Sequence, residues 1–303
     1  MDDSSSAPSS ASPSDSSLAH QLSGHLGNLN PTQEQALATF KDILTKANLY
    51  TPAVEGSDVV KASHDDATLL RFLRARNFNP VTAQKQFADT ENWRKKHNVT
   101  KLYHGISPED LDLSRRFYPR WTGRRDKLGL PLYVYRLASI ILYEFMTRFT
   151  FPLCSHLPRA TAPIPVSSTT TIIDLDNASF GSMWRLRTHL QEASRLSTSN
   201  YPETLHHIAI VNSPSFFPTI WNWIKGWFDE GTRKKIHVLG RDPGSALCEL
   251  VHSRDLPAVY GGELEWRYED EPHLDEDVKQ VIGDFPKGPV VFVDGRVEQP
   301  SST

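Results

Sequence analysis

The strongest apolar pattern in the chain runs from residue 212 to residue 240, NSPSFFPTIWNWIKGWFDEGTRKKIHVLG. Its large apolar side chains recur at helical spacing and wrap over half of a predicted helix; they are Phe216, Phe217, Ile220, Trp221, Trp223, Ile224, Trp227 and Phe228. Pro218 suits a first helical turn, because that position needs no N–H donor. The helix is too short to span a bilayer, which takes about 20 apolar residues. The pattern therefore indicates a core helix, a lid over an apolar pocket, or a helix at a membrane interface.

A cationic turn and a short strand follow this helix. Arg233, Lys234 and Lys235 stand together, and IHVL from residue 236 has the pattern of a strand. An apolar lid beside a cationic turn suits an amphiphilic ligand such as a phospholipid. An ordinary core helix beside solvated charges gives the same pattern, so both interpretations stay open on this stretch alone.

The chain from residue 30 to about residue 115 is patterned as helices with short connections. Asn30 is an N-cap residue, Pro31 fits the first turn, and Gln33 occupies the capping-box position. Further helix starts are predicted at Asp65 or Asp66, at Asn79–Pro80 and at Ser107–Pro108. These signals predict a helical N-terminal domain.

From about residue 118 the pattern changes to strands separated by helices. Strands are predicted at 131–137, 169–175, 207–211 and 236–239, helices at 180–199 and 245–251, a charged turn at 124–129, and strand character without a clear partner at 288–294. Strands that alternate with helices indicate an α/β domain with a mostly parallel sheet.

Composition and charge narrow the class of protein. Hydrophobic residues make up 38% of the chain and charged residues 23%, which is typical of a globular protein. Lys+Arg 33 against Asp+Glu 36 gives a net charge of −3, so no global basic field indicates nucleic-acid binding. Residues 1–29 are mostly Ser, Pro, Ala and Asp, which predicts a disordered tail. No secretory signal and no apolar run of transmembrane length is found, so we expect a cytoplasmic chain that meets membranes through its folded surface.

No pattern of catalytic or metal-binding residues is found. The chain lacks a nucleophile elbow, a P-loop, a dinucleotide-binding glycine motif and a zinc-protease motif, and its 12 histidines are scattered. The two cysteines, Cys154 and Cys248, form no CxxC pattern. We therefore expect no enzymatic activity, no metal and no cofactor, and the missing nucleophile elbow disfavours an esterase-like α/β enzyme.

A set of short motifs follows in order along the chain: DDATLLRFLRARNF with a Trp-Arg-Lys helix after it, then FYPRW, DKLGLPLYVYRL, TTIIDL, EAS…YPE, IVNSPSFF, TRKKIHVLG and LPAVYGGEL. Together they resemble the CRAL-TRIO lipid-binding family, and they are most similar to its phosphatidylinositol/phosphatidylcholine transfer proteins. The resemblance covers about residues 26–266. It implies a helical N-terminal domain, an α/β domain with a mostly parallel sheet, and an apolar lipid cavity under a gate helix at residues 216–228.

The resemblance also implies which residues bind a phosphatidylinositol headgroup. An Arg, a Glu, a Thr and a Lys carry over to Arg76, Glu192, Thr232 and Lys235. Thr232 and Lys235 are three residues apart and can share a helix face, from which both can donate to a phosphate. Glu192 would accept from inositol hydroxyls or hold Lys235, and Arg76 would brace the headgroup from the helical domain. The alternative for all four is surface ion pairing.

For phosphatidylcholine the resemblance implies two strand hydroxyls and two tyrosines. The corresponding residues are Thr122, Tyr133, Thr169 and Thr171. Thr122 stands where the family has an aromatic residue, and aromatic faces favour a quaternary ammonium. We therefore predict weak phosphatidylcholine binding that Thr122→Tyr improves. The segment 138–166 is also shorter than the resemblance implies, and the usual long helix is not expected there.

These observations lead to one prediction of function. We expect a monomeric phospholipid-binding protein that exchanges phosphatidylinositol, with phosphatidylcholine as second ligand, between Golgi or endosomal membranes in vesicle trafficking. The alternatives are a carrier for a sterol or terpenoid and a regulatory scaffold that presents lipid without transferring it. The predicted parts are the tail at 1–29, the helical domain at 30–115, the lipid-binding domain at 116–266 and an acidic C-terminal extension at 267–303.

Overall fold

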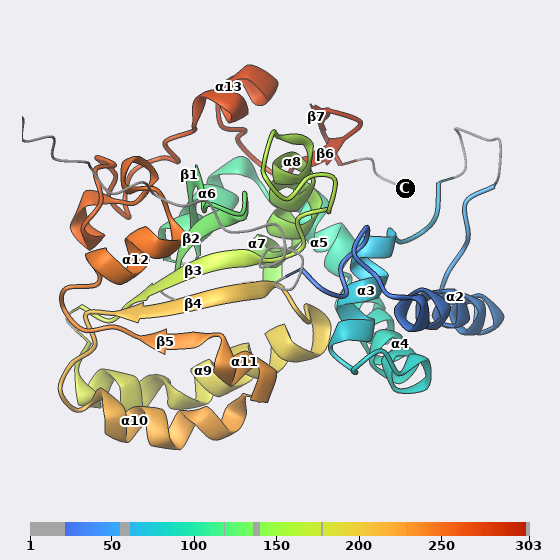
Figure 1. Cartoon of the computed structure of the whole chain (residues 1–303), viewed down its shortest axis with the longest axis horizontal. Helices are drawn as coiled ribbons and strands as arrows, with labels where there is room; N and C mark the ends of the chain where they lie inside the picture. The colour runs from blue at the N-terminus through green and yellow to red at the C-terminus, as the bar shows by residue number, and fades with distance from the viewer. Residues whose placement is uncertain are drawn as a thin grey trace, which may run out of the picture.

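The structure is a computed structural model that describes residues 22–54, 61–117, 119–135, 140–176, 178–228 and 230–300. Its N-terminal helices are α2 (Pro31–Lys46), α3 (Asp66–Arg74), α4 (Pro80–Lys96), α5 (Val99–Gly105) and α6 (Pro108–Phe117). Helices α2, α3 and α4 lie together at one end of the molecule, at the right of Figure 1. They pack around Phe40, Leu69 and Phe87, which are almost fully buried.

The predicted helix starts in this domain are confirmed. Asn30 accepts from the backbone N–H of Gln33, and the Gln33 side chain accepts from the backbone N–H of Asn30. The Asp65 side chain accepts from the backbone N–H of Thr68 at the start of α3, and Asn79 accepts from those of Val81 and Thr82 at the start of α4. Helix α5, which the sequence did not predict, has Asn98 as its N-cap residue, and the Asn98 side chain makes no capping hydrogen bond.

Residues before Asn30 are partly packed, so the predicted tail boundary at residue 29 is wrong. Leu22 is buried, and Leu26 and Leu29 pack against the α2–α4 core. The Arg74 guanidinium donates to the Gly24 carbonyl over 3.3 Å. We therefore expect deletion of residues 22–28 to lower stability, while residues 1–21 lie outside the described residues.

The α/β domain is built on one five-stranded sheet in the order β1-β2-β3-β4-β5. Its strands are β1 (Arg120–Arg125), β2 (Pro131–Tyr135), β3 (Thr169–Asp174), β4 (Leu205–Val211) and β5 (Ile236–Val238). Strand β1 pairs antiparallel with β2, and β2 to β5 run parallel. The predicted, mostly parallel sheet is confirmed, but β1 extends into the segment that was predicted as a charged turn.

Helices cover both faces of this sheet. On one face lie α9 (Phe180–Asn200) and α10 (Phe217–Ile224), next to each other along the bottom of Figure 1. The 3-10 helix η2 (Lys225–Trp227) and α11 (Glu230–Lys234) follow α10. The other face is covered by the helices α12 (Gly244–Leu250), η3 (Ser253–Asp255) and η4 (Ala258–Tyr260). In this layer Leu247, Leu256 and Trp266 pack against apolar side chains of β2, β3 and β4.

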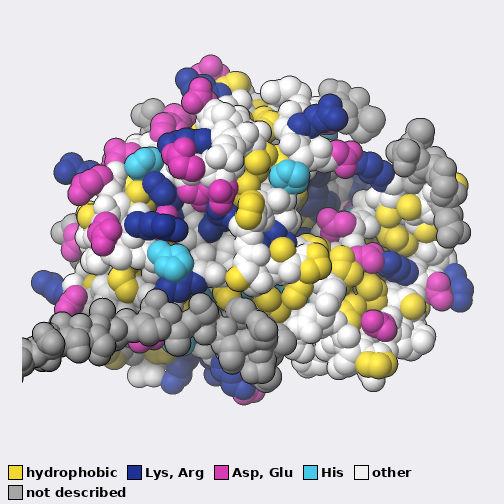
Figure 2. All heavy atoms as spheres, turned by 45° about the horizontal axis from the view of Figure 1, so that its top comes forward, with side chains coloured by type: hydrophobic (Ala, Val, Ile, Leu, Met, Phe, Trp, Pro, Cys, Tyr) yellow, Lys and Arg dark blue, Asp and Glu magenta, His cyan; other side chains and the backbone are white. Residues whose placement is uncertain are grey.

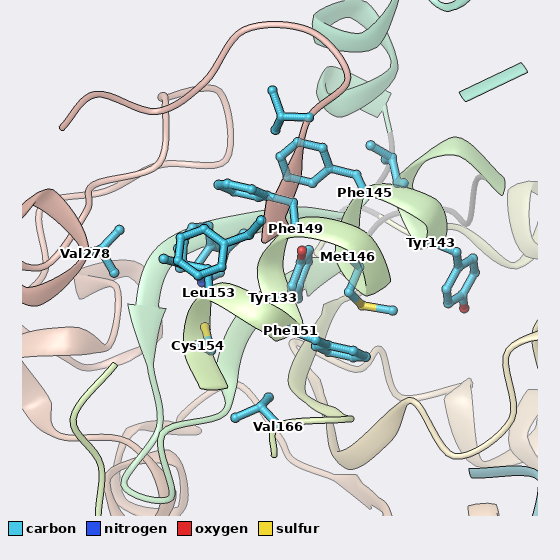
Figure 3. Close-up of a cluster of buried hydrophobic side chains, with 14 of the residues drawn as sticks. Tyr133, Tyr143, Phe145, Met146, Phe149, Phe151, Leu153, Cys154, Val166 and Val278 are labelled. Atoms are coloured by element: carbon cyan, nitrogen blue, oxygen red, sulfur yellow. The ribbon is translucent and has the colours of Figure 1, made fainter. Parts of the chain in front are cut away.

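The segment between β2 and β3 contains a helix that the sequence did not predict. It runs through α7 (Ile140–Phe145), the π-helix η1 (Met146–Thr150) and α8 (Phe151–His156). Figure 3 shows its side chains gathered with Tyr133 of β2 and Val278 in one apolar cluster. Phe149 and Leu153 are fully buried there. This continuous helix corrects the expectation that no long helix follows β2.

The C-terminal extension packs on the α/β domain. Its elements are α13 (Glu276–Ile282), β6 (Val291–Val293) and β7 (Arg296–Glu298), and β6 pairs antiparallel with β7. Arg125 donates to Asp275 and Asp277 over 3.0 and 2.8 Å. Figure 2 shows acidic and basic side chains intermixed on the face that carries this segment. Val278 and Val290 are buried in the same apolar cluster as Tyr133, Phe149 and Leu153. The extension is therefore part of the folded α/β domain.

Among the described residues, no helix combines the length and the apolar character that crossing a bilayer requires.

Candidate headgroup site and gate helix

A hollow of about 510 Å³ lies where the helical domain meets the C-terminal end of α9, α11 and β5. Its lining includes Arg76, Thr232 and Lys235, three of the four residues predicted to bind a headgroup. Arg76 comes from the turn after α3, Thr232 from α11, and Lys235 from the position between α11 and β5. We call this space the α9–α11 hollow. The fold thus brings together side chains that are separated by more than half of the chain.

The partner of Lys235 in the hollow is Glu203. The Lys235 Nζ lies 2.8 Å from the Glu203 Oε2, and both side chains are about three-quarters buried. Glu203 follows the Tyr201–Pro202 turn with a backbone φ of 57°, in the left-handed region. Non-glycine residues seldom adopt this conformation, and it is enriched at functional sites. The turn places the Glu203 carboxylate against Lys235.

Arg74 adds a buried positive charge beside this pair. Its guanidinium donates to the Gly24 carbonyl and to the Ser167 hydroxyl, over 3.3 and 3.2 Å. Burial lowers the pKa of Arg74 to about 10, and the charge of Glu203 opposes that shift. Because Arg74 stays protonated at neutral pH, the lining of the hollow attracts an anion. Arg76, by contrast, is exposed and donates to the Ala75 carbonyl over 2.7 Å.

One form of the prediction placed Glu192 against Lys235, and the structure does not show this contact. It is exposed and pairs with Arg195 on its own helix, with 2.6 Å between Oε1 and Nη2. It lines a neighbouring hollow of about 940 Å³ between α4 and α9, which also contains Arg76. The carboxylate that pairs with Lys235 in the α9–α11 hollow therefore belongs to Glu203.

Three of the four residues predicted to bind phosphatidylcholine form a buried polar group on one face of the sheet. The Tyr133 hydroxyl lies 3.0 Å from the Thr150 hydroxyl, and the Thr169 and Thr171 hydroxyls are 3.0 Å apart. Burial raises the pKa of Tyr133, so it keeps its proton.

Thr122 lies apart from this group. Its hydroxyl donates to the Leu132 carbonyl over 3.2 Å, and its side chain is fully buried. Trp121, and not Thr122, is in register with Tyr133 and shares its apolar cluster. Because neighbouring strand residues point to opposite faces, Thr122 is directed away from Tyr133.

The gate helix α10 lies directly on the sheet. Phe217 and Ile220 are buried against Ile208 and Ile210 of β4. Partly buried side chains widen this contact; they are Phe216, Trp221 and Ile224. Trp223 is not part of this contact, and its side chain is 47% exposed. One side of the helix thus packs on the sheet and another is exposed. The helix ends at Ile224, and Trp227 lies in η2 with Phe228 directly after it.

Comparison with known proteins identifies the fold family. Residues 119–262 match the CRAL/TRIO domain, and residues 36–89 match the CRAL/TRIO N-terminal domain. The Sec14 cytosolic factor of Schizosaccharomyces pombe is 34% identical over 261 residues, which cover 80% of this chain and 86% of the relative. This chain belongs to the CRAL/TRIO family.

Two further comparisons agree with this. The phosphatidylinositol/phosphatidylcholine transfer protein SFH9 of Arabidopsis thaliana is 30% identical over 243 residues, covering 73% of this chain and 41% of the relative. The crystal structure of Sfh5 superposes with a TM-score of 0.57 at 20% identity, over 83% of this chain and 96% of the other. The comparison with Sfh5 supports the fold. The resemblance to the CRAL-TRIO family that the sequence motifs indicated is confirmed.

Sequence reasoning missed Glu203, Arg74 and Trp121 in this CRAL/TRIO chain. Glu203 was present in the YPE motif and Arg74 in the FLRAR motif, but neither motif shows which side chain turns inward. A glutamate directly after proline, at the point where a helix gives way to a strand, was the available signal for Glu203.

Proposed function

We propose that this chain is a phospholipid exchange protein that binds one phosphatidylinositol with its acyl chains buried. The observation that carries the proposal is the Lys235–Glu203 pair in a cationic hollow beside an apolar gate helix. The names of its relatives, cytosolic factors and phosphatidylinositol/phosphatidylcholine transfer proteins, support the same class of ligand.

The α9–α11 hollow offers each part of an inositol phosphate a chemical partner. Lys235 donates to the phosphate in charge-assisted hydrogen bonds, and the buried charge of Arg74 strengthens the positive potential there. When Lys235 turns to the phosphate, the Glu203 carboxylate becomes available to accept from inositol hydroxyls. A polyol headgroup suits this combination better than a sterol, which carries no phosphate for the two cations.

The acyl chains would enter where α10 now covers β4. Phe217 and Ile220 pack on the sheet against Ile208 and Ile210. Lifting α10 exposes this apolar surface, which buried acyl chains then cover at about 0.8 kcal/mol per CH₂ group. The gain offsets the cost of separating the helix from the sheet. Phosphatidylcholine is the second ligand in this proposal, with its headgroup near Tyr133, Thr169 and Thr171.

The setting of this activity is part of the proposal. We propose a monomeric, cytoplasmic carrier without enzymatic activity that visits Golgi or endosomal membranes. The relatives described as cytosolic factors support a location outside the bilayer.

The test is transfer of labelled phosphatidylinositol between vesicles by Lys235→Ala and Glu203→Gln, with Glu192→Gln as the matched control. We expect both variants in the hollow to lose at least tenfold in rate, because a charged hydrogen bond contributes about 1.5–3 kcal/mol. Glu192→Gln should retain transfer, since Glu192 pairs only on the surface of α9. Normal transfer by both hollow variants, with intact folding by circular dichroism, would refute the proposed headgroup site.

A further inference from the structure

Arg115 of α6 is a buried cation. The residue is 6% exposed, and its Nη2 atom has no hydrogen-bond partner among the described residues. Nor is any ion pair or hydrogen bond to Arg115 found in the part of the chain that the structure describes. Burial lowers the pKa of Arg115 to about 10, so the side chain keeps its charge at neutral pH. A buried guanidinium has five N–H donors, and leaving them without acceptors costs free energy.

Two phenyl rings hold the Arg115 guanidinium in place. Its Cζ atom lies 4.5 Å from the centre of the Phe145 ring and 4.6 Å from that of the Phe285 ring. Phe145 belongs to the buried cluster of Figure 3, and Phe285 follows α13 in the C-terminal extension. Aromatic rings attract the charge but are not oxygen acceptors, so the N–H groups stay available to an oxyanion.

The Arg115 side chain lines a hollow of about 880 Å³ between α6 and the C-terminal extension. Pro108 and Arg115 form the α6 side of this space, and Leu274 and Phe285 form the side of the extension. Its volume lies in the range of small-molecule sites, which combine apolar walls with a few polar groups. We call this space the Arg115 hollow.

The other charges at the hollow limit what Arg115 can bind. The charged lining residues besides Arg115 are Glu109, Asp112, Glu271, Asp284, Lys279 and Lys287. His273 also lines it, and burial lowers the pKa of His273, so this imidazole is neutral at pH 7. The carboxylates therefore outnumber the cations, and they repel a dianion such as phosphate more strongly than a monoanion. Together with the apolar walls, these charges favour a monocarboxylate.

We propose that the Arg115 hollow binds a small carboxylic acid with an apolar body, at a site separate from the phospholipid. The carboxylate accepts from two N–H groups of the Arg115 guanidinium, whose planar fork matches a carboxylate. The apolar body lies against Leu274 and Phe285. Such a ligand bridges α6 and the C-terminal extension. The lining residues of the Arg115 hollow and of the α9–α11 hollow do not overlap.

The test is isothermal titration of the full chain with hexanoate, with hexanol as the uncharged probe and inorganic phosphate as the more highly charged one. We expect wild type to bind hexanoate at least about tenfold more tightly than either of the others, because hexanoate alone combines a carboxylate with an apolar body. Arg115→Met, which keeps the length of the side chain, should lose about tenfold or more in hexanoate affinity. Arg254→Met is the matched control, since the Arg254 side chain is 78% exposed and lies outside the hollow.

Thermal unfolding separates a binding role of Arg115 from a structural one. Without ligand, Arg115→Met should unfold at a temperature no lower than wild type, because an apolar side chain replaces a buried cation that lacks acceptors. Saturating hexanoate should raise the melting temperature of wild type and leave that of Arg115→Met unchanged. A variant that unfolds about 5 °C lower and binds hexanoate as wild type does would make Arg115 a structural residue and overturn the proposal.

Two further measurements do not depend on how Arg115→Met folds. The guanidinium N–H signals of Arg115 in wild type should shift in nuclear magnetic resonance spectra when hexanoate is added, and unchanged signals would overturn the proposal. Lys235→Ala should bind hexanoate as wild type does, because Lys235 lines the α9–α11 hollow. Loss of hexanoate binding in Lys235→Ala, with wild-type binding in Arg115→Met, would place the acid in the phospholipid site and also refute the inference.

Discussion

At the scale of single residues, the sequence motifs predicted part of the lining of the α9–α11 hollow. Arg76, Thr232 and Lys235 were predicted and line one hollow. The glutamate was assigned to Glu192, whereas Glu203 contacts Lys235. Both glutamates stand in family motifs, but Glu203 lies in a turn with a left-handed backbone and faces Lys235, whereas Glu192 pairs with Arg195 on the surface of α9. That conformation depends on packing around the turn, so the sequence pattern did not determine it.

The structure revises the prediction for Thr122→Tyr. Thr122 is fully buried and bonded to the Leu132 carbonyl, so a tyrosine ring has no space there. We expect this substitution to lower the free energy of unfolding by about 1–3 kcal/mol, as overpacking does, without improving phosphatidylcholine binding. Urea denaturation and a phosphatidylcholine transfer assay measure the two effects. A stable variant with stronger phosphatidylcholine binding would restore the original prediction.

At the scale of elements, the sequence predicted the helices that carry local signals and missed those held by tertiary packing. Caps at Asn30, Asp65 and Asn79 identified α2, α3 and α4, because capping depends only on neighbouring residues. The run α7–η1–α8 has no side-chain cap at η1 or α8, and four of the six residues of α7 and three of the five residues of η1 are buried. A helix that is apolar on several sides shows no amphipathic period to detect. Strand β1 was missed because its sequence, RWTGRR, is polar.

The two sides of the gate helix predict opposite consequences of substitution. Phe217 is 2% exposed against the sheet, so Phe217→Ala should lower the free energy of unfolding by about 3–5 kcal/mol. Trp223→Ala should leave stability within about 0.5 kcal/mol and lower the exchange rate, because the side chain is exposed. Thermal unfolding and lipid exchange, measured on both variants, separate these effects. Equal destabilisation by the two substitutions would show that α10 is an ordinary core helix.

At the scale of the whole molecule, a buried ion pair joins the helical domain to the α/β domain. Arg94 of α4 donates to both carboxylate oxygens of Glu144 in α7, over 2.6 and 2.9 Å. Arg148 and the Tyr201 hydroxyl donate to the same carboxylate, each over 2.8 Å. Sequence reasoning predicted both domains but could not predict this junction, since its members are far apart in the chain and follow no motif.

The Glu144 junction makes stability depend on pH. Burial opposes ionisation of Glu144, but hydrogen bonds and charge from Arg94 outweigh it and lower the pKa to about 2, against an ordinary 4.5. A carboxylate with a lowered pKa stabilises the fold above pH 4.5 and loses that contribution as the pH falls through 2. The contribution is about 3 kcal/mol.

We therefore expect Glu144→Gln to be less stable than wild type at pH 7 and to approach wild type as the pH falls toward 2. Arg94→Ala should cost about 3–5 kcal/mol at pH 7, because it leaves a buried carboxylate with fewer partners. Urea denaturation at a series of pH values measures both. Parallel pH profiles for Glu144→Gln and wild type would show that this carboxylate does not contribute to the acid dependence.

The central claim is that this chain carries a phosphatidylinositol molecule in the α9–α11 hollow and under the gate helix. Native mass spectrometry of the purified chain, followed by lipid identification, tests it most directly. We predict one bound phosphatidylinositol per chain in wild type and in Glu192→Gln, and a large loss of that species in Lys235→Ala. A chain that holds a sterol, or that retains phosphatidylinositol equally in Lys235→Ala, would contradict the account.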